Sequence, residues 1–214
     1  MRVSKFVLVA FALLLVGAVC GAGALRAWQQ ARAYITAPHM SLRDARYEML
    51  KHATRKPTIG MLGDSITAGV PWAEVAACAS VANYGFHGDT SLQVLHRVRE
   101  VLLSPPKAVF LMVGANDVIN RVSPSETART VRAIVERLEA EGISVILHPI
   151  LPIDRLAEAV AETNNEVVKL LAGTKAAIVP LPIDIADTRD GLHLGPSGFV
   201  KWRDAIEPLM RQHC

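Results

Sequence analysis

Short apolar runs alternate with longer helix-like segments from Pro57 to the end of this 214-residue chain. The apolar runs have the length and composition of strands, and apolar residues recur at helical spacing in the segments between them. Parallel strands must be joined by crossover connections, which are usually helices. The alternation therefore predicts an α/β domain with a parallel sheet covered on both faces. The expected strands are Thr58 to Leu62, Val81 to Tyr84, Ala108 to Val113, Ser144 to His148 and Ala176 to Leu181.

Helix boundary signals support this division of the chain. Ser123 followed by Pro124 is typical of a helix start, with serine as the cap and proline at the first helical position. The helix that they begin is expected to end near Gly142, because glycine is the usual residue after a helix. Further helices are expected at Leu42 to His52, Leu156 to Ala172 and Ser197 to Arg211.

The N-terminal segment has a different character. After the basic residues Arg2 and Lys5, the chain runs from Phe6 to Leu25 without a charge, which is about the length of a membrane-spanning helix. The small residues at Ala22 to Ala24 fit signal-peptide cleavage equally well. We expect a signal peptide or membrane anchor over residues 1–25, a helical lead-in over 26–56, and the main domain over 57–214. In both cases we expect the domain to be exported, to the periplasm or the cell exterior. It would contact the membrane only through this segment.

Charge and cysteine content limit the partners and cofactors. The formal net charge of +3 falls nearly to zero when Arg2 and Lys5 are removed, so no nucleic-acid partner is indicated. No pattern typical of a metal site is present, and we expect no metal and no cofactor. In an oxidising compartment Cys78 and Cys214 could form a disulfide, with a buried thiol and a terminal thiol as the alternative.

A serine stands at the predicted carboxyl end of the first strand of the domain. Gly63-Asp64-Ser65 follows the apolar run and begins a turn, and this edge of an open α/β sheet is where ligands bind. A serine hydroxyl needs a neighbouring base to act as a nucleophile, and donors to stabilise the charge that develops on the substrate. Taken alone, the tripeptide is also an ordinary turn composition.

Three further segments are expected at the same edge. Residues 83–90 and 114–117 follow the second and third strands, and 190–193 precede the last helix. The glycine Gly88 and the amide of Asn116 could donate hydrogen bonds to a developing oxyanion, together with the Ser65 N–H. Asp190, three residues before His193, could hold the imidazole in one tautomer facing the serine. Ser65, Asp190 and His193 would then form a catalytic triad.

Four blocks in this order resemble the SGNH, or GDSL-type, hydrolase family. They are Gly63-Asp64-Ser65-Ile66-Thr67-Ala68-Gly69, Asn83-x-Gly85-x-x-Gly88-Asp89-Thr90, Gly114-x-Asn116-Asp117 and Asp190-x-x-His193. The resemblance implies Ser65 as nucleophile, His193 as base oriented by Asp190, and an oxyanion hole from Ser65, Gly88 and Asn116. It also implies a three-layer α/β/α sandwich with a five-stranded parallel, flavodoxin-like sheet, and hydrolysis of esters or thioesters through an acyl-enzyme. Ile66 stands where the family's motif has leucine, which is a mild exchange.

Three other side chains are open candidates for substrate binding. Trp72 could form a pocket wall or belong to the core, and His148 could face the site or be a structural histidine. His87 adjoins Gly88, but it lacks an acid three residues before it and is a poor candidate for the base.

Short insertions between the blocks leave little chain for a lid over long acyl tails. We therefore expect short acyl esters, acetyl above all, with a small-molecule ester or an O-acylated glycan of the cell envelope or exterior as substrate. Two alternatives stay open: an acyltransferase that uses the same site, and a non-catalytic glycan-binding protein with the hydrolase fold. The sequence does not fix the oligomeric state.

Overall fold

The computed structural model describes residues 42–54, 56–76 and 80–214. The chain divides into two compact units at residues 52 and 53, and each is described by itself. In the first unit a helix covers residues 42–50, within the range expected from the sequence. The predicted signal peptide or anchor and most of the lead-in lie outside the described residues. Within those residues, no helix has the length and apolar character needed to cross a membrane.

The second unit contains a five-stranded sheet in which every pairing is parallel, as the alternating pattern predicts. The spatial order is β2-β1-β3-β4-β5, the order of flavodoxin-like folds. The strands are β1 (Ile59–Gly63), β2 (Val81–Gly85), β3 (Ala108–Met112), β4 (Ser144–His148) and β5 (Ala177–Ile178).

The last strand is much shorter than the sequence suggested. The apolar run from Ala176 to Leu181 was expected to be a strand, but only Ala177–Ile178 pairs with β4, followed by one further bond from the Val179 N–H to the Leu147 carbonyl. Pro180 and Pro182 have no N–H to donate to a sheet, so the ladder ends where they begin. The apolar composition of the run reflects packing rather than an extended strand.

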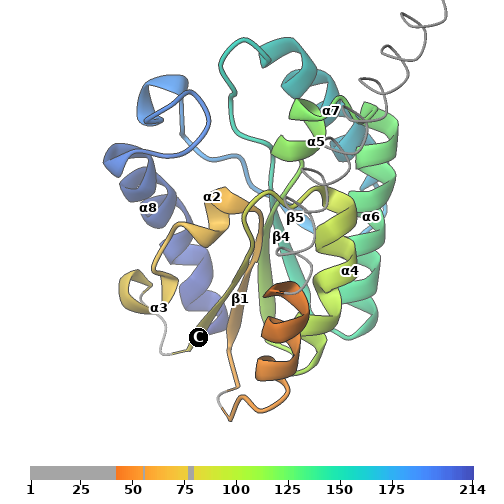
Figure 1. Ribbon diagram of the computed structural model, residues 1–214, viewed down its shortest axis with the longest axis vertical. Coiled ribbons are helices and arrows are strands. Elements are labelled where there is room, and N and C mark those ends of the chain that lie inside the picture. The colour runs from red at the N-terminus through yellow and green to blue at the C-terminus, as the bar shows by residue number, and fades with distance from the viewer. Residues whose placement is uncertain (1–41, 55, 77–79) are drawn as a thin grey trace, which may run out of the picture. The chain divides into compact units, whose positions relative to one another are not determined.

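Helices cover both faces of the sheet (Figure 1). The longer helices α4, α6 and α7 lie on one side, and α8 lies on the other with the short α3. Ser123 caps α6 by accepting a hydrogen bond from the Glu126 N–H, as expected from the sequence. The helices are α2 (Ser65–Ala68), α3 (Trp72–Val75), α4 (Ser91–Leu102), α5 (Ala115–Ile119), α6 (Pro124–Ala140), α7 (Ala157–Leu170) and α8 (Pro196–His213), with a 3₁₀ turn η1 (Ile185–Asp187).

The two faces of the sheet form two halves of the core. Met61, Phe110 and Ile146 stand in one row across β1, β3 and β4, in one apolar cluster with Trp202 and Ile206 of α8. The row one residue further along, Leu62, Leu111 and Leu147, faces the opposite side because side chains alternate along a strand. Both rows are almost completely buried. The central strands are thus fixed on both faces, which makes their carboxyl ends a rigid platform.

The C-terminal residue Cys214 is disulfide-bonded. Cys78, the partner expected from the sequence, lies outside the described residues, so this pairing stays a prediction.

Candidate active site

The serine turn is built by close backbone packing at the end of β1. Ser65 is the first residue of α2, and Asp64 caps that helix by accepting a hydrogen bond from the Ile66 N–H at 2.9 Å. At Gly85 of β2, a Cβ atom would lie 2.3 Å from the Ala68 backbone nitrogen. Only glycine allows α2 to lie so close to β2. The turn therefore presents the serine from a well-supported position.

Ser65, His193 and Asp190 form a continuous hydrogen-bonded chain. The Ser65 Oγ lies 3.0 Å from Nε2 of His193, and the His193 Nδ1 lies 2.8 Å from Oδ2 of Asp190. With the Nδ1 proton facing the carboxylate, Nε2 is free to accept the proton of the serine hydroxyl. The structure thus brings together Ser65 and the segment that carries Asp190 and His193, which is 128 residues away from Ser65 at His193.

The loop that precedes α8 fixes Asp190 itself. Oδ1 of Asp190 accepts hydrogen bonds from the backbone N–H groups of Leu192 at 3.1 Å and His193 at 2.7 Å. The backbone and side-chain hydrogen bonds from His193 lower the pKa of Asp190 to about 2. Although its side chain is 47% exposed, Asp190 is therefore a carboxylate at all ordinary pH values.

The segments after β2 and β3 meet beside the serine turn. Gly88 has a φ of 76°, a left-handed conformation that suits glycine, and a Cβ there would have no atom within 4 Å. Asn116 lies in the first turn of α5, and its Nδ2 donates to the Asp89 carbonyl at 2.9 Å. An amide nitrogen carries two protons, so this bond leaves one for a ligand. Both residues follow parallel strands at the edge that carries Ser65.

Two buried aspartates, Asp64 and Asp117, lie close to the segments that form the site. Asp64 is 1% exposed, and burial raises its pKa to about 7, with the charges of Asp89 and Asp117 adding to the rise. Asp117 accepts hydrogen bonds from the N–H of Ser91 at 2.7 Å and from its hydroxyl. Asp117 thereby joins α5 to the start of α4.

The three open candidates for substrate binding have different positions. Trp72 is a core residue, 2% exposed, with its ring edge against Trp202 and its N–H donated to the Thr67 carbonyl. His148 is also buried, its Nδ1 bonded to the Val179 carbonyl, and burial lowers its pKa to about 4. Neither can line a substrate pocket. His87 is exposed on the loop next to Gly88, where it can meet a ligand.

Two supporting residues were not assigned a role from the sequence. The side-chain amide of Asn83 donates to the carbonyls of Thr67, Ala68 and Val70 and so holds the end of the serine turn. Arg97 is a buried arginine on the apolar side of α4. The sequence does indicate that Arg97 is buried, because this residue falls at helical spacing among the apolar residues Val94, Val98 and Val101.

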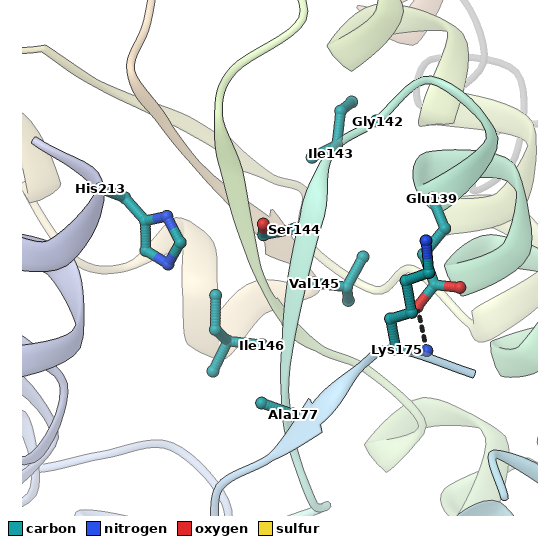
Figure 2. A pocket seen from close by; sticks show the side chains of 9 residues that line it. All are labelled: Glu139, Gly142, Ile143, Ser144, Val145, Ile146, Lys175, Ala177 and His213. Atoms are coloured by element: carbon teal, nitrogen blue, oxygen red, sulfur yellow. Dashed lines mark hydrogen bonds between the residues drawn. The ribbon is translucent and has the colours of Figure 1, made fainter. Parts of the chain in front are cut away.

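A separate cavity of about 410 Å³ lies at the other end of the strands (Figure 2). It opens beside Ser144, the first residue of β4, and Lys175 and His213 stand on its two sides. Since the strands are parallel, this cavity is on the edge opposite Ser65 and takes no part in the site. Over the residues described, no cluster of His, Cys, Asp and Glu side chains could hold a metal ion.

The chain matches the model of a known protein family. The model of the GDSL-like lipase/acylhydrolase family matches residues 61–199, which is more than half of the chain and includes all four blocks. A curated relative, thioesterase 1/protease 1/lysophospholipase L1 of Escherichia coli, is 31% identical over an alignment that covers 44% of this chain and 51% of the relative. The chain thus spans about half the length of the curated relatives it matches.

Solved structures share the fold at low sequence identity. A GDSL-like lipase from Bacteroides thetaiotaomicron superposes with a TM-score of 0.70 at 21% identity, over 79% of this chain and 98% of that one. A catalytic mutant of an acetylxylan esterase from Geobacillus stearothermophilus gives 0.58 at 18% identity, over 69% and 91%. At such identities the likeness establishes the fold.

Proposed function

The chain belongs to the GDSL-like lipase/acylhydrolase family, and from this premise we propose that it is a serine ester hydrolase for short acyl groups. The observation that carries the proposal is the hydrogen-bonded chain from Ser65 through His193 to Asp190. Such a chain supplies a nucleophile, a base and a group that orients the base.

The proposed reaction begins with proton transfer from Ser65 to His193. As the Oγ–H proton moves to Nε2, Oγ attacks the ester carbonyl carbon and the carbonyl oxygen becomes an anion. His193 then gives the proton to the departing alcohol oxygen, which leaves an acyl group on Ser65. A water molecule then gives a proton to His193 and attacks the acyl carbon. The bond to Oγ breaks as His193 returns the proton to it, which releases the acid and restores the Ser65 hydroxyl.

The anionic oxygen requires donors, and we assign these to the Ser65 N–H, the Gly88 N–H and Nδ2 of Asn116. The support is that the three segments meet at one edge of the sheet and that Asn116 has a second amide proton beyond the one given to Asp89. Loss of one donor of this kind typically slows the reaction by about 10²- to 10³-fold.

The preference for short acyl groups on a carbohydrate is the finer part of the proposal. Most connections at the site edge are short: Ser65 comes two residues after β1 and Asn116 four residues after β3. His193 is 30% exposed and Asp190 47% exposed, so the triad lies at the surface, where a bulky glycan can reach it. An acetylxylan esterase among the structural neighbours supports the choice of an acetylated carbohydrate as substrate.

The curated relative favours a second specificity, for thioesters or lysophospholipids. Its name refers to thioesters and lysophospholipids, and its 31% identity exceeds the 18% of the acetylxylan esterase. Assays with an acyl thioester, a lysophospholipid and an acetyl ester therefore separate the two specificities.

We further propose that the domain acts outside the cytoplasm, exported by the uncharged segment from Phe6 to Leu25. The disulfide at Cys214 supports this, because such bonds persist in oxidising compartments. Fractionation of cells that express the protein, with protease accessibility of the domain as the readout, tests the location. A domain found wholly in the cytoplasm would contradict it.

The decisive experiment measures hydrolysis of aryl esters, from acetyl to long-chain, by the wild type and by Ser65→Ala. The same substitution at an exposed serine, Ser125→Ala, is the control for effects of serine removal outside the site. We expect hydrolysis that is highest for acetyl, lost in Ser65→Ala and unchanged in Ser125→Ala. Release of acetate from acetylated xylo-oligosaccharides tests the carbohydrate assignment directly.

Other outcomes identify the alternatives. A maximum at long acyl chains would contradict the acetyl specificity. Acyl transfer to added glycan with little hydrolysis would make the protein an acyltransferase. A folded wild type whose Ser65 does not react with a serine-directed phosphonate would leave only a non-catalytic binding protein.

A further inference from the structure

Arg97 is a buried cation at the centre of the site's supporting structure. Its side chain is 3% exposed and projects from α4, with its guanidinium 5.5 Å from the centre of the Phe86 ring. A buried charge is costly unless it is paired and hydrogen-bonded. The identity of its partners therefore indicates what the arginine stabilises.

These partners belong to the ends of two strands and to the loop between β2 and α4. Nε donates to Oδ2 of Asp89 at 2.6 Å, one amino group donates to the Tyr84 carbonyl at 3.0 Å, and the other donates to the Gly63 carbonyl at 3.2 Å. Gly63 ends β1 two residues before Ser65, and Asp89 is the residue after Gly88. One guanidinium thus spans the segments that carry two of the proposed oxyanion donors.

The third donor is connected through the same aspartate. The Asp89 carbonyl accepts a proton from Nδ2 of Asn116 at 2.9 Å, while the Asp89 carboxylate is held by Arg97. Because one amide proton is fixed on this carbonyl, the direction of the other is fixed as well. Any shift of Asp89 would rotate the Asn116 amide away from its present direction.

We propose that Arg97 is a positioning residue that sets the geometry of the oxyanion hole, acting through Gly63, Asp89 and Asn116 without touching substrate. The inference rests on the proposed function, since it concerns the same site. Catalysis by fixed donors depends on their being in place before charge develops, and small displacements of such donors are costly.

The planar shape of the guanidinium is essential to this role. Its N–H groups form a rigid fork, and Arg97 uses Nε and both amino groups at once, with Glu100 as a further partner at 3.2 Å. An ammonium is a single point charge and cannot reach Asp89, Tyr84 and Gly63 together. Arg97→Lys thus keeps the buried charge but loses the geometry.

The test compares Arg97→Lys with Arg99→Lys, a matched change at an exposed arginine of the same helix. On aryl acetate we expect Arg97→Lys to lower kcat by about 10- to 100-fold with KM nearly unchanged, because the donors act mainly on the transition state. Arg99→Lys should keep the wild-type values. A denaturation curve for each variant shows how much of the protein is folded in the assay.

Two further measurements cover other results. In Arg97→Ala, millimolar guanidinium chloride should restore part of kcat, whereas equal sodium chloride should not. In ¹⁵N-labelled protein, Arg97→Lys should shift the side-chain amide signals of Asn116, and this readout does not depend on turnover.

A wild-type protein that hydrolyses none of the esters would reject the proposed function. The amide signals would then decide whether Arg97 positions Asn116. Unchanged kcat or amide signals, or a kcat loss equal to the unfolded fraction, would reject the role of Arg97.

Discussion

Asp190 combines an exposed position with a firmly held charge. Three hydrogen bonds, two from backbone N–H groups and one from the His193 ring, hold its carboxylate and lower its pKa to about 2. As the pH falls from neutral, Asp190 stays ionised until about pH 2. The carboxylate that orients His193 is therefore present at every pH above about 2.

Asp190→Asn tests this orienting role. The amide would donate to Nδ1 and thereby move the ring proton to Nε2, where it blocks transfer from Ser65. We expect kcat to fall by about 10³- to 10⁴-fold while the protein stays folded. The measurement is kcat across pH for wild type, Asp190→Asn and the exposed control Asp204→Asn. An Asp190→Asn enzyme with wild-type kcat would show that His193 needs no orienting carboxylate.

Asn116→Ala tests the proposed side-chain donor of the oxyanion hole. Removal of the amide should lower kcat by about 10²- to 10³-fold with little effect on KM. Asn120, at the other end of α5, is exposed and provides the matched control Asn120→Ala. Equal losses in both variants would indicate damage to α5 instead of a missing donor.

At the scale of elements, the position of Ser65 depends on how closely the short helix α2 packs against β2. A Cβ at Gly85 would lie 2.3 Å from the Ala68 nitrogen, whereas a Cβ at Gly69 would have only an ordinary contact of 3.4 Å. We expect Gly85→Ala to destabilise the domain by about 1 to 3 kcal/mol and to lower kcat, because α2 must move. Gly69→Ala should change stability by less than about 0.5 kcal/mol. Urea denaturation and kcat measure both effects, and a fully active, stable Gly85→Ala would show that the turn tolerates displacement.

Local patterns predicted much of the fold and the candidate site. The strand alternation gave the parallel sheet, and the order of the four blocks placed Ser65, Gly88, Asn116 and His193 on one edge. Contacts between distant segments were not predictable: nothing near Arg97 in the sequence indicates that it bonds to Gly63. Likewise, His148 ends β4 at the site edge, but only the packing of α8 shows that Trp202 covers it.

At the scale of the whole molecule, two buried ionisable groups give stability opposite dependences on pH. Burial lowers the pKa of His148 from 6.5 in the unfolded chain to about 4 in the fold. The unfolded chain therefore binds the proton first, and stability is lost as pH falls from 6.5 to 4. Burial raises the pKa of Asp64 from 3.8 in the unfolded chain to about 7 in the fold, so stability is lost as pH rises from 3.8 to 7. At 1.36 kcal/mol per pKa unit the two effects are about 3 and about 4 kcal/mol, so they largely cancel.

Single substitutions should separate the two effects. We expect the free energy of unfolding of His148→Asn, relative to wild type, to improve as pH falls from 6.5 to 4, because the penalty of the buried imidazole is gone. For Asp64→Asn, whose amide still accepts from the Ile66 N–H, we expect the relative stability to improve as pH rises from 4 to 7. Urea denaturation of wild type and both variants at several pH values gives these differences, and titrations common to the three proteins cancel. Parallel curves at all pH values would show that neither group is held in its neutral form by burial, and a slope of the opposite sign would contradict the assignment for that residue.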